Sequence, residues 1–337
     1  MVDEGPNMMR TALIGAGAMG SNHARTIDTH PNSTLALVVD VDEARARQVA
    51  GKYGAMWSAD PASVAGVDAA VVATPAHIHS AFVLDLLDSR VPVLVEKPAA
   101  LDPMEVGVML DVAETAGVHL AVGFVERFNP VVLAVHEHLA VFGPPVHTQM
   151  IRHSPANRAM PTSVVHDLLI HDLDLVDRLG AHGGVASNPP LLMGPTSDRH
   201  EAVDVTGRSG SMGFNLSASR IDQRKVRDLR VVTETALLEA DLLRRTMTIY
   251  RHVTHGVSRE SGYQAQTVMD IPFVRQEGEP LSLQWSAFLG AARCPDEGRD
   301  GLMGVVDVHA AAADIEMGLG HTGRGSVVAV SAHAGVS

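Results

Sequence analysis

The sequence is short of cysteine, of aromatic residues and of positive charge, and each shortage excludes a class of protein. The one cysteine, Cys294, leaves no partner for an intrachain disulfide and no thiolate set for zinc or an iron–sulfur cluster, which suits a reducing compartment. Aromatic residues make up 4% of the chain, too few for the stacking platforms of single-strand binders. Lysine and arginine number 26 against 39 acidic residues, and the net charge of −13 repels a phosphate backbone. We therefore expect no nucleic acid partner.

Long apolar runs are missing as well. No stretch approaches the roughly 18 uninterrupted apolar residues of a membrane-spanning helix, so no membrane partner is expected. The first nine residues contain Asp3, Glu4 and Pro6 and lack both the basic start and the apolar run of a secretory signal. These features predict a cytoplasmic protein with a flexible leader at residues 1–9.

A chain of 337 residues with 46% apolar composition is long enough for two domains with buried cores. Near its start, short apolar runs alternate with segments of helical spacing. The runs cover residues 11–14, 34–39, 69–73, 93–95 and 119–122. This alternation is typical of parallel strands joined by crossover helices, and it predicts a doubly wound Rossmann domain over residues 10–123.

After Gly123 the pattern changes to that of an α+β domain over residues 124–320. One helix is expected at 131–142, one strand at 146–151, and an interruption rich in proline, glycine, serine and asparagine at 181–196. Alternating apolar and polar residues then predict successive antiparallel strands with one solvated face, at 213–221, 227–233, 236–241 and 246–251. Helices are expected last, at 283–292 and 302–319, before a tail at 321–337 whose order the pattern leaves open.

A glycine-rich loop follows the first predicted strand. Residues 15–20 fit G-x-G-x-x-G and lie between a predicted strand and a predicted helix. Gly15 permits the tight turn, Gly17 lets the backbone approach a pyrophosphate and Gly20 allows close packing, with Ala18 and Met19 completing the loop. Asp40 ends the second strand, 20 residues past Gly20, where a carboxylate binds ribose hydroxyls and repels a 2′-phosphate. The loop therefore predicts a dinucleotide, with NAD favoured over NADP.

Lysine is rare in this chain, and its three positions are Lys52, Lys97 and Lys225. Lys97 directly follows the predicted strand at 93–95, at the strand end where open α/β sheets bind ligands. A lysine can shift its pKa and exchange a proton, as arginine cannot. Lys97 is therefore a candidate catalytic residue, and the alternative is a solvated loop lysine.

A second candidate segment covers residues 165–174, whose apolar spacing predicts a helix with Asp167 and His171 on one face. Histidine commonly removes an alcohol proton near neutral pH, and a carboxylate one turn away can orient it or bind a substrate hydroxyl. An acidic helix N-terminus is the alternative. A metal site is disfavoured because His166 and His171, five residues apart, do not face one point, although Asp172 and Asp174 are also possible ligands.

With these motifs in order, the chain resembles the glucose-fructose oxidoreductase / inositol dehydrogenase / rhizopine-catabolism (Gfo/Idh/MocA) family of NAD(P)-dependent oxidoreductases. The resemblance rests on the Gly15 loop, Ala73-Thr74-Pro75 with His79, Glu96-Lys97-Pro98, residues 123–130, and Asp167 with His171. It implies an open, mostly antiparallel second sheet whose exposed face often forms homodimers or homotetramers. It also implies that Lys97, Asp167 and His171 are the reacting set, while Thr74, Pro75, His79 and Glu96 line the nicotinamide side.

Within that family, residues 123–130, 171–174 and 225–227 resemble the branch that oxidises the 3-hydroxyl of UDP-N-acetylglucosamine. Three candidate substrate-binding residues are cations that can hold a phosphate or carboxylate: Arg127, Arg152 and Lys225. The other candidates are the amide Asn129 and the reacting pair Asp167 and His171. Arg227 can add positive charge nearby. For each cation the alternative is a surface charge.

The resulting hypothesis is hydride transfer between the nicotinamide and a secondary hydroxyl of a sugar or nucleotide sugar. His171 would remove the hydroxyl proton, Lys97 would stabilise the developing alkoxide and Asp167 would orient His171 or the substrate. Whether Lys97 or His171 is the final base stays open, because it depends on burial. The alternatives are an inositol or polyol dehydrogenase, a keto-sugar reductase, an NAD-dependent glycosidase and a non-catalytic NAD-binding regulatory protein.

Overall fold

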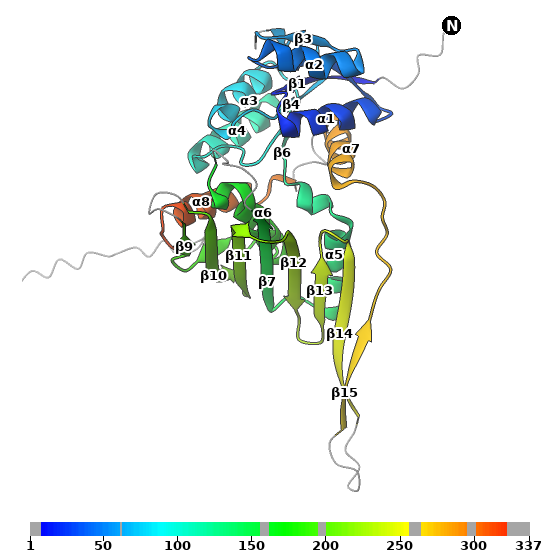
Figure 1. The fold of residues 1–337 in the computed structure, drawn as a ribbon, viewed down its shortest axis with the longest axis vertical. Helices are drawn as coiled ribbons and strands as arrows, with labels where there is room; N and C mark the ends of the chain where they lie inside the picture. Colours follow the sequence, from blue (N-terminus) through cyan, green and yellow to red (C-terminus); the bar gives the residue numbers. More distant parts are fainter. Residues whose placement is uncertain are drawn as a thin grey trace, which may run out of the picture.

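The computed structural model describes residues 8–60, 63–155, 162–194, 200–255, 264–294 and 301–321. It consists of a parallel sheet wrapped by helices and, below it in Figure 1, a larger sheet with helices on one side. Residues 1–7 of the expected leader and 322–337 of the expected tail lie outside the described residues. Within the described part, no helix combines the length and apolarity needed to cross a bilayer.

The first sheet has six parallel strands in the order β3-β2-β1-β4-β5-β6, so the predicted Rossmann architecture is confirmed. The strands are β1 (Met9–Ile14), β2 (Ser33–Val39), β3 (Met56–Ser58), β4 (Ala69–Val72), β5 (Val93–Val95) and β6 (Leu120–Val122). The helices between them are α1 (Ala18–Thr29), α2 (Glu43–Tyr53), α3 (His79–Asp88) and α4 (Pro103–Ala116). The short edge strand β3 was not among the predicted strands.

Side-chain alternation gives this sheet two separate cores, because successive strand residues point to opposite faces. Leu13 and Val38 pack with Ala24 of α1 and Val49 of α2 on one face. Ile14 and its neighbours on the other face pack with the α3 and α4 helices. Burial on both faces explains why the strands are near-continuous apolar runs.

The second sheet has nine strands, and its mostly antiparallel pairing confirms the predicted class. The order is β15-β14-β13-β12-β7-β11-β10-β8, with β9 paired to β10. The strands are β7 (His147–Pro155), β8 (Val185–Ser187), β9 (Leu191–Met193), β10 (Ala202–Ser209), β11 (Met212–Asp222), β12 (Val226–Val232), β13 (Leu237–Asp241), β14 (Thr246–His255) and β15 (Gln264–Asp270).

Two expectations for this sheet were wrong. The strand β11 pairs in parallel with β7, where a plain antiparallel succession was expected, because the helix and short strands that follow β7 return the chain to the same end of the sheet. The stretch at 181–196, read as an interruption, contains the three-residue strands β8 and β9. Strands this short give no periodicity to detect.

Three helices pack near this sheet, and a fourth returns to the first one. The three are α5 (Pro130–Phe142), α6 (Ile170–Leu179) and α8 (Val305–Glu316). The fourth, α7 (Pro280–Arg293), crosses back and packs against α1, as Figure 1 shows. Its Trp285 is fully buried with Phe288 in the core around Leu13, and the Trp285 indole donates to Ser33 Oγ at 2.9 Å. A helix far along the chain thereby completes the core of the nucleotide-binding sheet.

Candidate active site

The glycine-rich loop is held by close backbone packing. Gly15 has a φ of +95°, and a Cβ there would lie 2.6 Å from the Ala73 carbonyl carbon. A Cβ at Gly20 would lie 1.9 Å from the Gly15 carbonyl oxygen, so helix α1 can start this close only with glycine. By contrast, a Cβ at Gly17 would meet nothing within 4 Å. The open space therefore lies at the helix N-terminus, where free N–H groups favour phosphate oxygens.

Asp40 lies at the floor of the pocket beside this loop. Its carboxylate accepts from the backbone N–H of Ala16 at 2.8 Å and of Asp42 at 2.9 Å, and its side chain is nearly buried. The Arg45 guanidinium lies 3.5 Å from it and also lines the pocket, whose volume is about 340 Å³. These contacts fix the carboxylate at the end of β2 with oxygen lone pairs left for ribose hydroxyls.

A larger cleft of about 650 Å³ adjoins this pocket, and Thr74 and Pro75 line both spaces. The two other residues expected on the nicotinamide side, His79 and Glu96, also line this cleft, and so do Met19, Lys97 and Asp167. The shared residues place the pocket that contains Asp40 next to the cleft that contains Lys97.

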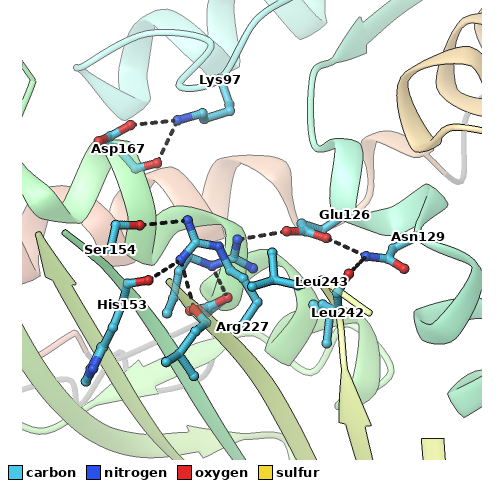
Figure 2. A network of polar contacts seen from close by, with 12 residues as sticks. Lys97, Glu126, Asn129, His153, Ser154, Asp167, Arg227, Leu242 and Leu243 are labelled. Atoms are coloured by element: carbon cyan, nitrogen blue, oxygen red, sulfur yellow. Dashed lines mark hydrogen bonds and ion pairs between the residues drawn. The ribbon is translucent and has the colours of Figure 1, made fainter. Parts of the chain in front are cut away.

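Lys97 and Asp167 meet across this cleft. The Lys97 ammonium donates to the Asp167 main-chain carbonyl at 2.7 Å and lies 3.5 Å from its carboxylate (Figure 2). Burial lowers the pKa of Lys97 below its ordinary value, and the Asp167 and Glu96 carboxylates oppose that shift. A lysine held in this way can give up its proton more easily than a solvated one.

The segment that carries Asp167 is not the single α-helix that the spacing predicts. Residues Val165–Leu169 form a wider π-helical turn (η4), and the regular helix α6 begins only at Ile170. Such turns recur at functional sites because they change the direction of side chains and main-chain groups. Here the Asp167 carbonyl accepts from Lys97, a contact that the spacing alone does not predict.

His171 lies one turn further on, with its ring edge-on to Phe124 at a centroid distance of 6.5 Å. Its Nδ1 is buried and has no hydrogen-bond partner among the described residues. Burial, followed by the charges of Lys97, Arg152 and Arg227, lowers the pKa of His171 well below its ordinary value. The imidazole is therefore neutral near pH 7, and Lys97 and Asp167 are the two members of the expected set in direct contact.

Two further histidines tie the walls of the site together. The His23 ring of α1 lies 2.7 Å from the Glu96 carboxylate, and both side chains are buried. Although burial raises the pKa of Glu96, this hydrogen bond and charge hold it below the ordinary value. The ring nitrogens of His79 lie 2.7 Å from the Thr74 carbonyl oxygen and 2.9 Å from that of Pro98. These contacts fix the loops after β4 and β5 relative to the glycine-rich loop.

The predicted substrate-binding cations are placed differently from one another. Arg127 is bidentate to the Asp174 carboxylate and also contacts a main-chain carbonyl. Arg152 donates to Asp172 at 2.6 Å and to Glu126 at 2.8 Å. Lys225 is exposed in the turn between β11 and β12. Arg127 and Arg152 thus donate most of their hydrogen bonds to internal carboxylates.

Asn129, the other expected substrate contact, has an internal role in this structure. Its side chain accepts from the Val131 N–H at the start of α5 and donates to the Glu126 carboxylate and to the Leu242 carbonyl (Figure 2). It is nearly fully buried. The residue therefore caps a helix and joins it to the second sheet.

Sequence reasoning missed several residues that line the two hollows. Arg45 follows Asp40 by five positions, and only the start of α2 beside the loop makes it a neighbour. His166 lines the cleft, whereas the argument from spacing treated it only as a metal ligand. Thr162, Ser163 and Glu316 come from segments without any motif. Their positions follow from the π-helical turn and from the docking of α8.

Comparisons with known proteins identify related sequences and structures. The family model for oxidoreductases with an NAD-binding Rossmann fold, Gfo/Idh/MocA, matches residues 9–124. The chain is 31% identical over 277 residues to UDP-N-acetylglucosamine 3-dehydrogenase of Acidithiobacillus ferrooxidans, covering 81% of this chain and 83% of the relative. It is also 35% identical over 181 residues to inositol 2-dehydrogenase of Acidothermus cellulolyticus, covering 50% of this chain and 52% of that enzyme.

The fold comparison leads to the same group. The solved structure of the A. ferrooxidans enzyme GnnA superimposes with a TM-score of 0.79 at 27% identity, covering 93% of this chain and 97% of that one. A relative this similar over four-fifths of the chain, together with the matched nucleotide-binding domain, establishes the grouping. The chain belongs to the Gfo/Idh/MocA family of nicotinamide-dependent oxidoreductases.

Proposed function

We propose that this enzyme transfers hydride between NAD and the C3 hydroxyl of a nucleotide sugar such as UDP-N-acetylglucosamine. The observation that carries the proposal is the Lys97–Asp167 contact in a cleft that shares Thr74 and Pro75 with the pocket of the glycine-rich loop. A relative that oxidises this position of this sugar supports the choice of substrate. The same parts serve the reverse reduction of a keto sugar.

The residues fit a dinucleotide, with phosphates at Gly17, a ribose at Asp40 and the nicotinamide beside Thr74 and Pro75. When bound, the nicotinamide supplies the hydride acceptor. The chain's own residues handle the proton. Lys97, with its lowered pKa, takes the proton from the hydroxyl, and Asp167 holds the amine in place. His171 stays neutral and hydrogen-bonds the substrate, because burial, followed by the charges of nearby Arg152 and Arg227, lowers its pKa.

The preference for NAD rests on Asp40. Its carboxylate is anchored by two backbone N–H groups, so it cannot swing away from a 2′-phosphate. Repulsion between the two anions disfavours NADP. Arg45, at 3.5 Å, partly offsets that repulsion, so we propose a strong preference rather than full exclusion.

Location and assembly are also proposals. The single exposed cysteine suits the cytoplasm. The face of the second sheet opposite α6 carries many polar and partly exposed side chains, such as Asn215 and Arg230. Because the open sheet face often forms oligomers in this family, the proposed assembly is a homodimer or homotetramer through this face.

The test is a panel of substrates scored by NADH formation. UDP-N-acetylglucosamine, its uronate, myo-inositol and glucose are each incubated with NAD and enzyme. The proposal predicts NADH from the nucleotide sugars and little from the neutral polyols. NADH from myo-inositol alone would assign the enzyme to the polyol dehydrogenases, and sugar release without net NADH would indicate a glycosidase.

A further inference from the structure

Arg227 of β12 lies directly opposite Arg152 of β7 in the antiparallel register. Opposed residues of neighbouring strands point to the same face of a sheet, and like charges in that position are destabilising. The face is the one covered by α6, because Arg152 donates to Asp172 of that helix. Two guanidinium groups therefore lie together on the side of the sheet that faces the reacting residues.

Among the ion pairs of the described residues, Asp172 and Glu126 pair only with Arg152. Arg152 takes Asp172 at 2.6 Å and Glu126 at 2.8 Å, and its pKa is raised because their attraction outweighs burial. Among the described residues, no carboxylate oxygen lies within ion-pair distance of the Arg227 guanidinium. Both carboxylates thus form ion pairs with Arg152 alone, although their charges also oppose the fall in the pKa of Arg227.

The contacts of Arg227 are all with neutral groups. Its Nη1 donates at 3.0 Å to the carbonyl oxygens of His153 and Val226, and its Nη2 donates to Ser154 Oγ at 3.2 Å (Figure 2). Its Nε–H has no acceptor in the described part of the chain. Burial and then the charge of Arg152 lower the pKa of Arg227 to about 10, so it remains a cation at neutral pH.

The charge of Arg227 acts on the reacting residues. It is one of the three cations that lower the pKa of His171, and the Asp167 carboxylate in turn stabilises it. A half-buried cation without an ionic partner, placed next to another cation, lowers stability unless a ligand neutralises it. An anionic ligand bound at Arg227 would provide that neutralisation.

We infer that Arg227 binds an anionic oxygen of the substrate, a phosphate or a carboxylate, close to the carbon that loses hydride. The inference rests on the proposed function and names the substrate class, an anionic sugar rather than a neutral polyol. Arg127 and Arg152 do not provide this contact because internal carboxylates occupy them. The free Nε–H and the delocalised charge suit phosphate and carboxylate oxygens equally.

Equilibrium binding to the NADH-loaded enzyme tests the inference without turnover, because the reduced cofactor cannot accept hydride from an alcohol. Calorimetry is run with UDP-N-acetylglucosamine, its uronate and neutral N-acetylglucosamine, on the wild type, Arg227→Gln, Arg227→Lys and Arg230→Gln. Arg230 is a matched control, since it lies on the same strand and pairs with Glu239 on the opposite face.

We expect Arg227→Gln to weaken binding of the anionic sugars by about 30-fold, Arg227→Lys to retain part of the affinity and Arg230→Gln to change it less than about twofold. Equal weakening for both nucleotide sugars identifies a phosphate as the ligand group, and weakening confined to the uronate identifies the carboxylate. Unchanged affinities in Arg227→Gln would overturn the inference, as would a wild type that binds neither anionic sugar. Binding that depends on Arg227 without NADH formation would refute the proposed reaction and leave this inference standing.

Thermal unfolding separates this role from a structural one. Because Arg227→Gln relieves repulsion from Arg152, we expect its Tm to equal or exceed that of the wild type. If the variant does not fold, the salt dependence of ligand binding to the wild type tests whether a charge–charge contact holds the substrate. The Kd for the anionic sugars should rise with ionic strength while that for N-acetylglucosamine stays constant, and an equal response for all three would contradict the inference.

Discussion

At the scale of single residues, Lys97 has the clearest chemical role. It is one of three lysines in a chain whose other basic residues are arginines, and it lies at a strand end in contact with Asp167. Lys97→Ala should lower turnover at least ~100-fold while NAD binding is kept, because the group that exchanges the proton is lost. Lys52→Ala, on the exposed side of α2, is the control. Unchanged turnover in Lys97→Ala would remove this residue from the mechanism.

The pH profile tests the same residue in the wild type. Oxidation requires Lys97 in its neutral form, so kcat should rise with pH as the ammonium loses its proton. Burial lowers the pKa of Lys97, and the midpoint should therefore lie below the ordinary value of 10.5. A flat profile, or one that falls as pH rises, would be inconsistent with Lys97 as the base.

Asp40 is the residue that sets cofactor choice. Removing its carboxylate in Asp40→Ala ends the repulsion of a 2′-phosphate and releases the Arg45 Nη1 group, while Arg45 Nη2 keeps its ion pair with Asp42. The ratio of kcat/KM for NADP to that for NAD should rise at least ~10-fold. Glu43→Ala, in the exposed first turn of α2, should leave the ratio unchanged. No change in Asp40→Ala would mean that another residue selects the cofactor.

At the scale of elements, α7 shows how a late segment stabilises an early domain. Trp285 is fully buried between α7 and the first sheet, and its indole donates to Ser33 Oγ. Trp285→Ala should lower the free energy of unfolding by about 3–5 kcal/mol through the lost contacts and the cavity. Ser286→Ala, on the exposed side of the same helix, should cost less than about 0.5 kcal/mol. Urea denaturation measures both free energies of unfolding. A loss in Trp285→Ala as small as the one expected for Ser286→Ala would show that α7 contributes little to stability.

Elements also mark where the sequence stops being informative. The parallel sheet was predictable, because strands buried on both faces leave clear apolar runs and the glycine-rich loop has a local steric reason. The packing of α7 against the first sheet was not predictable, because an apolar helix face does not indicate which part of the protein it packs against. The π-helical turn at Val165–Leu169 was missed for a related reason, because its residues keep the spacing of an α-helix.

At the scale of the whole molecule, the site is made by three distant parts of the chain. Met19 of the glycine-rich loop, Lys97 after β5 and Asp167 of the π-helical turn line one cleft. Arg227, the proposed substrate contact, comes from β12 of the second sheet. Sequence reasoning found the members that stand in motifs. It could not find which arginine lacks a carboxylate, because that depends on the pairing of β7 with β12 and on the contacts of Arg152.

The most direct test of the central claim follows a labelled hydrogen. UDP-N-acetylglucosamine deuterated at C3 is incubated with NAD and the enzyme, and the reduced cofactor is examined by mass spectrometry. If hydride passes from C3 to the nicotinamide in the cleft at Lys97, the NADH carries the deuterium. Unlabelled NADH would place the oxidised carbon elsewhere, and an absence of NADH, with no reduction of the 3-keto sugar in the reverse direction, would contradict the account.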